Sequence, residues 1–178
     1  MSASLAWQTR RVKWRRRIPA EIGAAVELDR GERSLAWTTD MAGRHIVATD
    51  HDLILQRNPP VYERIGWESI DQASYADGEL SLTLVPTNDE PAARLRIPVG
   101  DDTRLAVVIR DRVTSSIVVN QHMMLEGRRG LRVVARRRFG DPRLRWGYVA
   151  DSGTTLDQTL RAAADDLVEQ VQRESGLV

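Results

Sequence analysis

The side chains best suited to bind a metal or to carry protons near neutral pH are three histidines, His45, His51 and His122. A metal-binding helix often presents two histidines four residues apart, as in the HExxH pattern, and the sequence has no such pair. A metal site would therefore need histidines from separate strands to converge. We expect instead three histidines that lie at the surface or in turns.

The run Asp50-His51-Asp52 places two carboxylates and an imidazole in consecutive positions, a composition suited to catalysis or metal binding. Successive side chains of a strand point to opposite faces, so these three groups cannot meet at one point in an extended chain. In a turn, aspartates stabilise the backbone by accepting hydrogen bonds from nearby amides. We therefore predict a turn here.

Sequence patterns of covalent catalysis and of nucleotide binding are missing. The chain has no cysteine, which excludes disulfides, thiolate metal sites and cysteine nucleophiles. It has no G-x-S-x-G or S-x-x-K motif and no phosphate-binding or dinucleotide fingerprint. The GRRG at 127–130 matches the GxxG of a KH domain, but it joins two strand-like runs instead of two helices, which favours a hairpin turn. We predict a protein that is not an enzyme and uses no cofactor or metal.

Charge is unevenly distributed along the 178 residues, although the net charge is only +1. Residues 1–17 carry six basic residues and no acid, whereas residues 18–125 carry seventeen acidic and ten basic residues. Residues 126–146 contain eight arginines and two acids, and residues 147–178 contain six acids and two arginines. This alternation indicates either an anionic partner or parts of one molecule that attract each other.

The first basic block consists of Arg10, Arg11, Lys13, Arg15, Arg16 and Arg17. Trp7 and Trp14 accompany it, and their spacing puts them on one face of a helix. Tryptophan among arginines can stack on bases, insert at a lipid interface or dock on a protein surface. Because residues 18–125 are acidic, we predict that the two tryptophans dock on the protein's own body or on a second copy, with nucleic acid as the alternative.

The second basic block consists of Arg128, Arg129, Arg132, Arg136, Arg137, Arg138, Arg143 and Arg145, on what we predict to be neighbouring strands. Like charges on one sheet repel each other unless something neutralises them. Acidic residues of 147–178, notably Asp165, Asp166 and Glu169, could do so. Nucleic-acid phosphates, a membrane surface or an acidic protein could do so as well. We favour internal neutralisation and keep all of these arginines except Arg132 as candidate contacts to an anionic partner.

Residues 19–99 read as a short helix and a series of strands. Pro19 can open the helix, with Ile22 and Val26 on one side. Apolar and β-favouring runs separated by turn residues predict seven strands. They cover residues 34–40, 45–50, 53–57, 62–68, 69–76, 80–85 and 94–99.

Helical periodicity begins at residue 101. Leu105, Val108, Ile109 and Val113 share one face of a predicted helix over 101–117, which Asp101, Asp102 or Thr103 can cap. Strands are predicted over 117–125, 131–138 and 143–150. A last helix, capped by Thr154 or Thr155 and ended by Gly176, has an apolar stripe that we expect on the sheet face of Trp146 and Tyr148. The stripe comprises Leu156, Leu160, Ala163, Ala164, Leu167 and Val171.

The segments HIVATDHDLIL (45–55) and YERIGWESIDQAS (62–74) resemble the bacterial pleckstrin-homology-like and GRAM-type domains. That resemblance implies a small barrel of about seven strands closed by one helix, here residues 101–117. The segment RDRVTSSIVVNQHMMLEGRRGLRVVARR (110–137) and the arm WRRRIPAEI (14–22) are similar to an uncharacterised actinobacterial family. The shared motifs are structural, so the resemblance implies a fold and assigns no functional residue.

The sequence as a whole predicts an α+β fold: a small antiparallel barrel of pleckstrin-homology-like type closed by one helix, followed by a ββα elaboration. We predict a basic N-terminal arm and short helix at 1–30, the barrel at 31–117, and a strand-rich extension with an amphipathic helix at 118–178. The longest uncharged stretch, 114–125, is too short to span a bilayer.

The predicted function is a cytoplasmic binding or assembly module that acts through a protein partner or a homo-oligomer. A nucleic-acid-binding protein is the alternative. The sequence identifies no small-molecule ligand.

Overall fold

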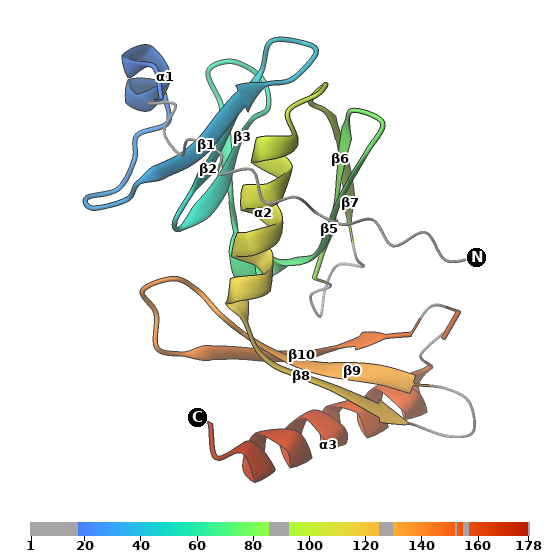
Figure 1. Ribbon diagram of the computed structural model, residues 1–178. Coiled ribbons are helices and arrows are strands. Elements are labelled where there is room, and N and C mark those ends of the chain that lie inside the picture. The colour runs from blue at the N-terminus through green and yellow to red at the C-terminus, as the bar shows by residue number, and fades with distance from the viewer. Residues whose placement is uncertain (1–17, 86–92, 125–129, 152, 155–156, 178) are drawn as a thin grey trace, which may run out of the picture.

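The computed structural model describes residues 18–85, 93–124, 130–151, 153–154 and 157–177. These residues form a mixed α+β fold with three antiparallel sheets, three α-helices and one short 3-10 helix (Figure 1). Two of the sheets and the helices α1 and α2 make up what we call the body. The third sheet and α3 make up what we call the extension.

The first sheet has the strand order β1-β2-β3-β4. Its strands are β1 (Ser34–Thr39), β2 (His45–Thr49), β3 (Asp52–Gln56) and β4 (Tyr62–Gly66). A tight turn at Asp50 and His51 joins β2 to β3, which confirms the turn predicted there. Asp40 closes the turn between β1 and β2, because its carboxylate accepts hydrogen bonds from the amides of Ala42 and Arg44.

The second sheet has the order β5-β6-β7, with β5 (Ile70–Ala76), β6 (Glu79–Leu84) and β7 (Arg94–Pro98). The 3-10 helix η1 (Trp67–Ser69) links it to β4. Asp77 and Gly78 form the hairpin turn between β5 and β6, with positive φ angles of 50° and 77°. All seven strands predicted before the central helix are therefore confirmed.

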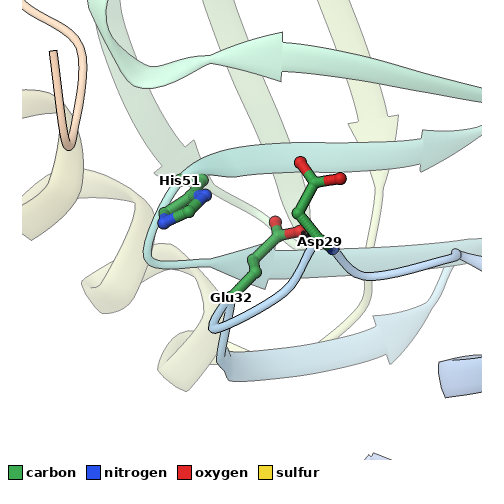
Figure 2. Close-up of side chains that lie close together, drawn as sticks. All are labelled: Asp29, Glu32 and His51. Carbon is green, nitrogen blue, oxygen red and sulfur yellow. Dashed lines mark hydrogen bonds between the residues drawn. The ribbon is translucent and has the colours of Figure 1, made fainter.

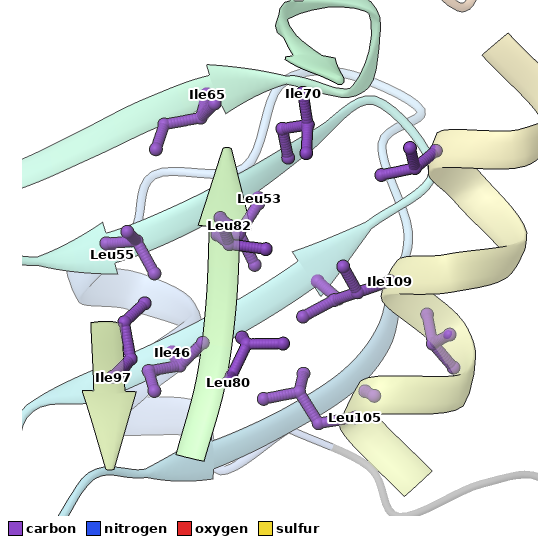
Figure 3. Close-up of a cluster of buried hydrophobic side chains, with 14 of the residues drawn as sticks. Ile46, Leu53, Leu55, Ile65, Ile70, Leu80, Leu82, Ile97, Leu105 and Ile109 are labelled. Carbon is purple, nitrogen blue, oxygen red and sulfur yellow. The ribbon is translucent and has the colours of Figure 1, made fainter. Parts of the chain in front are cut away.

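The two sheets of the body enclose one apolar core (Figure 3). Leu53, Leu82 and Ile109 come from the first sheet, the second sheet and α2 (Thr103–Ser116), and each is completely buried. The cap of α2 is Asp102, whose Oδ1 accepts a hydrogen bond of 3.1 Å from the Leu105 amide. The predicted helix and its four buried apolar residues are confirmed.

A smaller cluster lies on the outer face of the first sheet. The helix α1 (Ala20–Ala25) begins after Pro19, as predicted. Ile22 and Val26 pack on Val47 and Ile54 of β2 and β3. These two strands are therefore buried on both faces, which explains why their sequences are continuous apolar runs.

The extension begins without a loop, because α2 ends at Ser116 and β8 (Ile117–Met124) starts at the next residue. The third sheet has the order β10-β9-β8, with β9 (Gly130–Arg137) and β10 (Leu144–Ala150). It lies between the body and α3 (Gln158–Ser175) (Figure 1). Leu131 and Val133 of β9 meet Ala164 and Val171 of α3, together with the predicted Trp146, Tyr148 and Leu167.

One sequence prediction about the fold is not confirmed, and another needs correction. Among the described residues no sheet closes on itself, so the structure does not confirm a barrel. The cap of α3 is Asp157 instead of Thr154 or Thr155, because the Asp157 carboxylate accepts a 2.9 Å hydrogen bond from the Leu160 amide. Leu156, predicted in the apolar stripe, precedes this helix and lies outside the described residues.

Within the described part of the chain, no helix has the length and apolar character that crossing a lipid bilayer requires.

Candidate functional site: an arginine–carboxylate junction

Part of the second basic block faces the body of the same chain. Four of its arginines, on β9, β10 and the turn between them, pair with three buried carboxylates on β3, η1 and β5. We call this set the junction. It contains Arg132, Arg136, Arg138, Arg145, Asp52, Glu68 and Asp71.

Arg136 is the innermost arginine of the junction, with an exposed fraction of 2%. Its guanidinium donates to the Asp71 carboxylate at 3.1 Å, to the Asp71 carbonyl at 3.2 Å and to the Ser116 hydroxyl at 3.2 Å. Burial lowers the pKa of Arg136, and the Asp71 charge opposes this change. Arg136 was a candidate contact for an anionic partner, but its side chain is inside the protein.

Asp71 also serves a second arginine. An Nη atom of Arg132, two residues before Val134 on β9, lies 3.5 Å from the second carboxylate oxygen of Asp71. Arg132 and Arg136 therefore project from the face of β9 opposite to α3, because Leu131 and Val133 occupy the α3 face. One buried carboxylate thus holds the middle strand of the extension against β5.

Asp52 is the second anchor of the junction. Arg138 donates to its two carboxylate oxygens at 3.3 and 3.4 Å, and Arg64 of β4 donates to one of them at 3.2 Å. Arg64 also donates to both oxygens of Glu32 at 3.0 Å. Asp52 and Glu32 are buried, so this network ties the turn after β9 to the first sheet and to the chain segment before β1.

Glu68 is the third anchor and the least satisfied. Its exposed fraction is 4%, and Arg145 approaches one oxygen only to 3.7 Å. Among the described residues its other carboxylate oxygen has no hydrogen-bond partner. Gly66 makes room for this carboxylate, because a Cβ atom at position 66 would lie 2.5 Å from both of its oxygens.

The junction corrects one sequence prediction. Internal neutralisation was expected from Asp165, Asp166 and Glu169, but these residues are exposed on α3. Within the described ranges, the ion pairs of the block use Asp52, Glu68, Asp71 and Asp141 instead. The reason is the face of the sheet: α3 covers the apolar face of β9, whereas the arginines project from the other face.

Arginines remain exposed at the tip of the β9–β10 hairpin. Arg143 and Arg145 have side chains that are 86% and 65% exposed, and Arg137 is exposed with no ion pair to any described residue. Hydrogen bonds from Arg143 lower the pKa of Asp141 to about 2. Phe139, 51% exposed, lies beside His51 with a ring-centroid distance of 4.9 Å.

The remaining candidate residues lie outside the described residues. This applies to the first basic block, to Trp7 and Trp14, and to Arg128 and Arg129. Their predicted docking or anion contacts stay predictions. The residues in question are Arg10, Arg11, Lys13, Arg15, Arg16 and Arg17, together with the four just named.

The three histidines occupy separate places. His45 hydrogen-bonds to the Tyr62 hydroxyl at 2.8 Å, and His122 on β8 pairs with Asp151 at 2.9 Å. His51 lies in the β2–β3 turn, where the three consecutive side chains diverge as predicted. Asp50 forms an ion pair with Arg33, Asp52 forms an ion pair with Arg64, and the His51 ring packs beside the Phe139 ring.

The sequence did not indicate that Asp29, Glu32 and His51 lie close together, with ligand atoms within 4.8 Å of one another (Figure 2). However, the Glu32 carboxylate already accepts hydrogen bonds from the Thr49 hydroxyl at 2.6 Å and from the Asp29 amide at 2.8 Å, besides those from Arg64. Burial acts to raise the pKa of Glu32, but these bonds outweigh it and the pKa is lowered. A guanidinium thus already contacts both oxygens of Glu32, and the geometry favours a structural anchor.

Two shallow grooves are also present. One, of about 370 Å³, runs between the end of β8 and α3, with Met124, Leu160 and Leu167 in its lining. The other, of about 630 Å³, lies at the start of α2, with Met41, Tyr75 and Asp101 in its lining. Both combine apolar side chains with carboxylates.

No protein-family model matches the chain, and a search of the curated proteins finds no match. The proposals below therefore depend on the residues and contacts described above.

Proposed function

We propose that the protein is a non-enzymatic binding and assembly module that acts through protein–protein contacts. The junction carries this proposal. In it, four arginines of the second basic block pair with three carboxylates of the same chain, so part of the positive charge on the described hairpin is already balanced. On the described part of the chain, the surfaces left for a partner are then grooves and a strand edge, not a basic cleft.

We further propose that β1–β7 and α2 adopt the pleckstrin-homology-like arrangement. Four strands and three strands form two facing sheets, and α2 packs in the core between them. The Met41 amide donates to the Pro98 carbonyl at 3.0 Å, which joins the corner between the two sheets, while η1 joins β4 to β5. Such folds carry many unrelated ligands, so the arrangement supports a binding role without naming the partner. The absence of cysteine agrees with a reducing cytoplasm as the place of action.

Nucleic-acid binding remains the second candidate because of the hairpin tip. Exposed Arg137, Arg143 and Arg145 accompany Phe139, a combination that can contact phosphates and stack on a base. This candidate predicts an affinity that falls steeply with salt, by roughly 0.7 to 0.9 in the log–log slope for each phosphate neutralised.

A salt series tests the two functions. We expect weak, non-specific binding to single-stranded and duplex oligonucleotides, with a dissociation constant of roughly 10⁻⁴ to 10⁻⁶ M near physiological salt. Filter binding between about 50 and 200 mM salt measures it. Submicromolar binding at the upper end would overturn the proposal.

A pair of variants makes the series specific to the hairpin. If the hairpin binds phosphates, Arg137→Ala with Arg145→Ala reduces the salt slope by about one to two. The matched control is Arg94→Ala with Arg96→Ala on β7, which removes the same charge from exposed positions of the body. Equal effects of the two pairs would show that only net charge matters.

Capture of partners from lysate, with and without nuclease, then separates protein partners from nucleic acid.

A further inference from the structure

The strand β8 is an edge of the third sheet and differs from the other edge strands. Its eight residues, IVVNQHMM, include no charged residue and no proline. Of the other edge strands, β4, β5, β7 and β10 each contain at least one charged residue, and β7 contains Pro98 as well. Charges and prolines at an edge prevent pairing with another chain, so β8 lacks the usual protection.

The strand β1 is also uncharged, but its edge is better covered. Thr39 is the single exposed residue among its six, and the Arg104 guanidinium donates to the Leu35 carbonyl at 3.4 Å. In β8, by contrast, five of eight residues are exposed, and Met124 is 55% exposed. Among the described residues, β9 is the only strand that pairs with β8.

We infer that β8 pairs antiparallel with β8 of a second copy of this chain, which joins two three-stranded sheets into one. This inference rests on the proposed assembly function and names its partner and its surface. A twofold axis makes such a contact closed and self-complementary. Self-association is also consistent with a net charge of only +1, because little overall repulsion opposes it.

The pairing register follows from the two faces of the strand. Residues directly opposite each other in an antiparallel pair lie on the same face of the sheet. Register irregularity in β8 is confined to its start, between Ile117 and Val119. A twofold axis at Gln121 then pairs Gln121 with its own copy, and Val119 with the second copy's Met123. Val119 and Met123 both pack against the cluster under α3, so this register extends the apolar face across the axis.

The groove beside β8 supports the same partner. It lies between Met124 and α3, on the edge at which the second copy would join. The twofold axis places both α3 helices on one face of the joined sheet and makes them antiparallel. Asp166 and Arg173, which both line the groove, have opposite charges, so the two antiparallel grooves present each other with charges of both signs.

A cysteine placed at the axis tests the register directly, because the natural chain has none. In the inferred dimer, Gln121→Cys places two thiols on opposing residues, within the Cα separation of about 4.4 to 6.8 Å that a disulfide needs. We expect a covalent dimer on mild oxidation. Gln72→Cys on β5, another exposed glutamine of an edge strand, is the matched control and should stay monomeric on a non-reducing gel.

A charge at the same position tests the contact without a crosslink. Sedimentation of the unmodified chain should give twice the chain mass, in a concentration-dependent equilibrium. Gln121→Lys places two ammonium groups opposite each other and should raise the dimer dissociation constant at least about ten-fold. Gln72→Lys should leave it unchanged, and circular dichroism of both variants should match the parent chain.

The outcomes separate this inference from the proposed function. A dimer that persists in Gln121→Lys, with no crosslink in Gln121→Cys, would show that assembly uses another surface; the inference would fail and the proposed function would stand. A monomer at all concentrations overturns the inference as well. The edge of β8 would then be open to a different occupant, either a protein partner or residues 1–17. Submicromolar nucleic-acid binding at about 200 mM salt would overturn the proposed function itself.

Discussion

The body and the extension bury their sheets in different ways. In the body, two sheets and α2 surround a core of apolar side chains such as Leu53, Leu82 and Ile109. In the extension, one face of the sheet packs on α3 through apolar contacts, while the other face meets the body through arginines and buried carboxylates. Apolar packing tolerates small shifts, whereas a buried ion pair requires its partner at a defined position. The contrast teaches that the extension is attached to the body in a specified orientation.

The largest expected effect comes from Asp71→Ala. This change leaves the Arg136 guanidinium buried without its carboxylate, and we expect a loss of about 3 to 5 kcal/mol in the free energy of unfolding. Chemical denaturation monitored by circular dichroism measures it.

A double variant tests whether charge is the cause. Asp71→Leu together with Arg136→Met removes both charges, and it should recover most of the lost stability because apolar replacements of a buried pair are often neutral. If Asp71→Ala alone costs less than about 0.5 kcal/mol, as at ordinary surface sites, the junction does not hold the two regions together.

The apolar half of the comparison is tested by Leu160→Ala. Leu160 of α3 is 4% exposed, and a large-to-small change at a core position costs about 2 to 5 kcal/mol. Hydrogen exchange should then show faster exchange at β8, β9 and β10 than at β2 and β3, because opening starts locally. Ile109→Ala in the body is the reverse experiment, in which exchange should become faster at β2 and β3 than at β8, β9 and β10. Val107→Ala, at an exposed position of α2, is the control. Uniform acceleration in both core variants would show that body and extension unfold as one unit.

The smallest of these effects is the change in the free energy of unfolding at acidic pH. The pKa of Glu32 and that of Asp50 are lowered in the folded protein, by hydrogen bonds that outweigh burial. A lowered pKa gives stability that is present above the ordinary carboxylate value of about 4 and is lost as the pH falls through the folded value. Glu32→Gln should cost about 1.5 kcal/mol at neutral pH, a value typical of hydrogen bonds to a charged group. Below pH 4 its stability should fall less steeply than that of the parent chain. Parallel denaturation curves from about pH 7 down to pH 3 check this, and equal slopes would contradict it.

Local signals made much of the fold predictable. Turn residues such as Asp77 and Gly78 separate apolar runs, and the cap at Asp102 precedes a helical period, so strands and helices could be located from the sequence. The ion pairs of the junction could not. Asp71 and Arg136 are 65 positions apart, and their meeting depends on which face of β9 the helix α3 covers. Thr49, whose hydroxyl organises the β2–β3 turn and bonds Glu32, gave no signal beyond a common strand residue.

The direct passage from α2 to β8 has a mechanical consequence. Ser116 ends the helix and Ile117 begins the strand, and the Ser116 hydroxyl is fixed by the Val113 carbonyl on one side and by Arg136 on the other. A loop at this point would absorb displacement, but here none exists. A partner bound in the groove at Thr103 that displaces this end of α2 would displace β8 as well. The two are joined by 14 helical residues, a rigid helix about 20 Å long. The groove at the start of α2 and the edge strand β8 are thus joined by one rigid element, so a displacement at one is transmitted to the other.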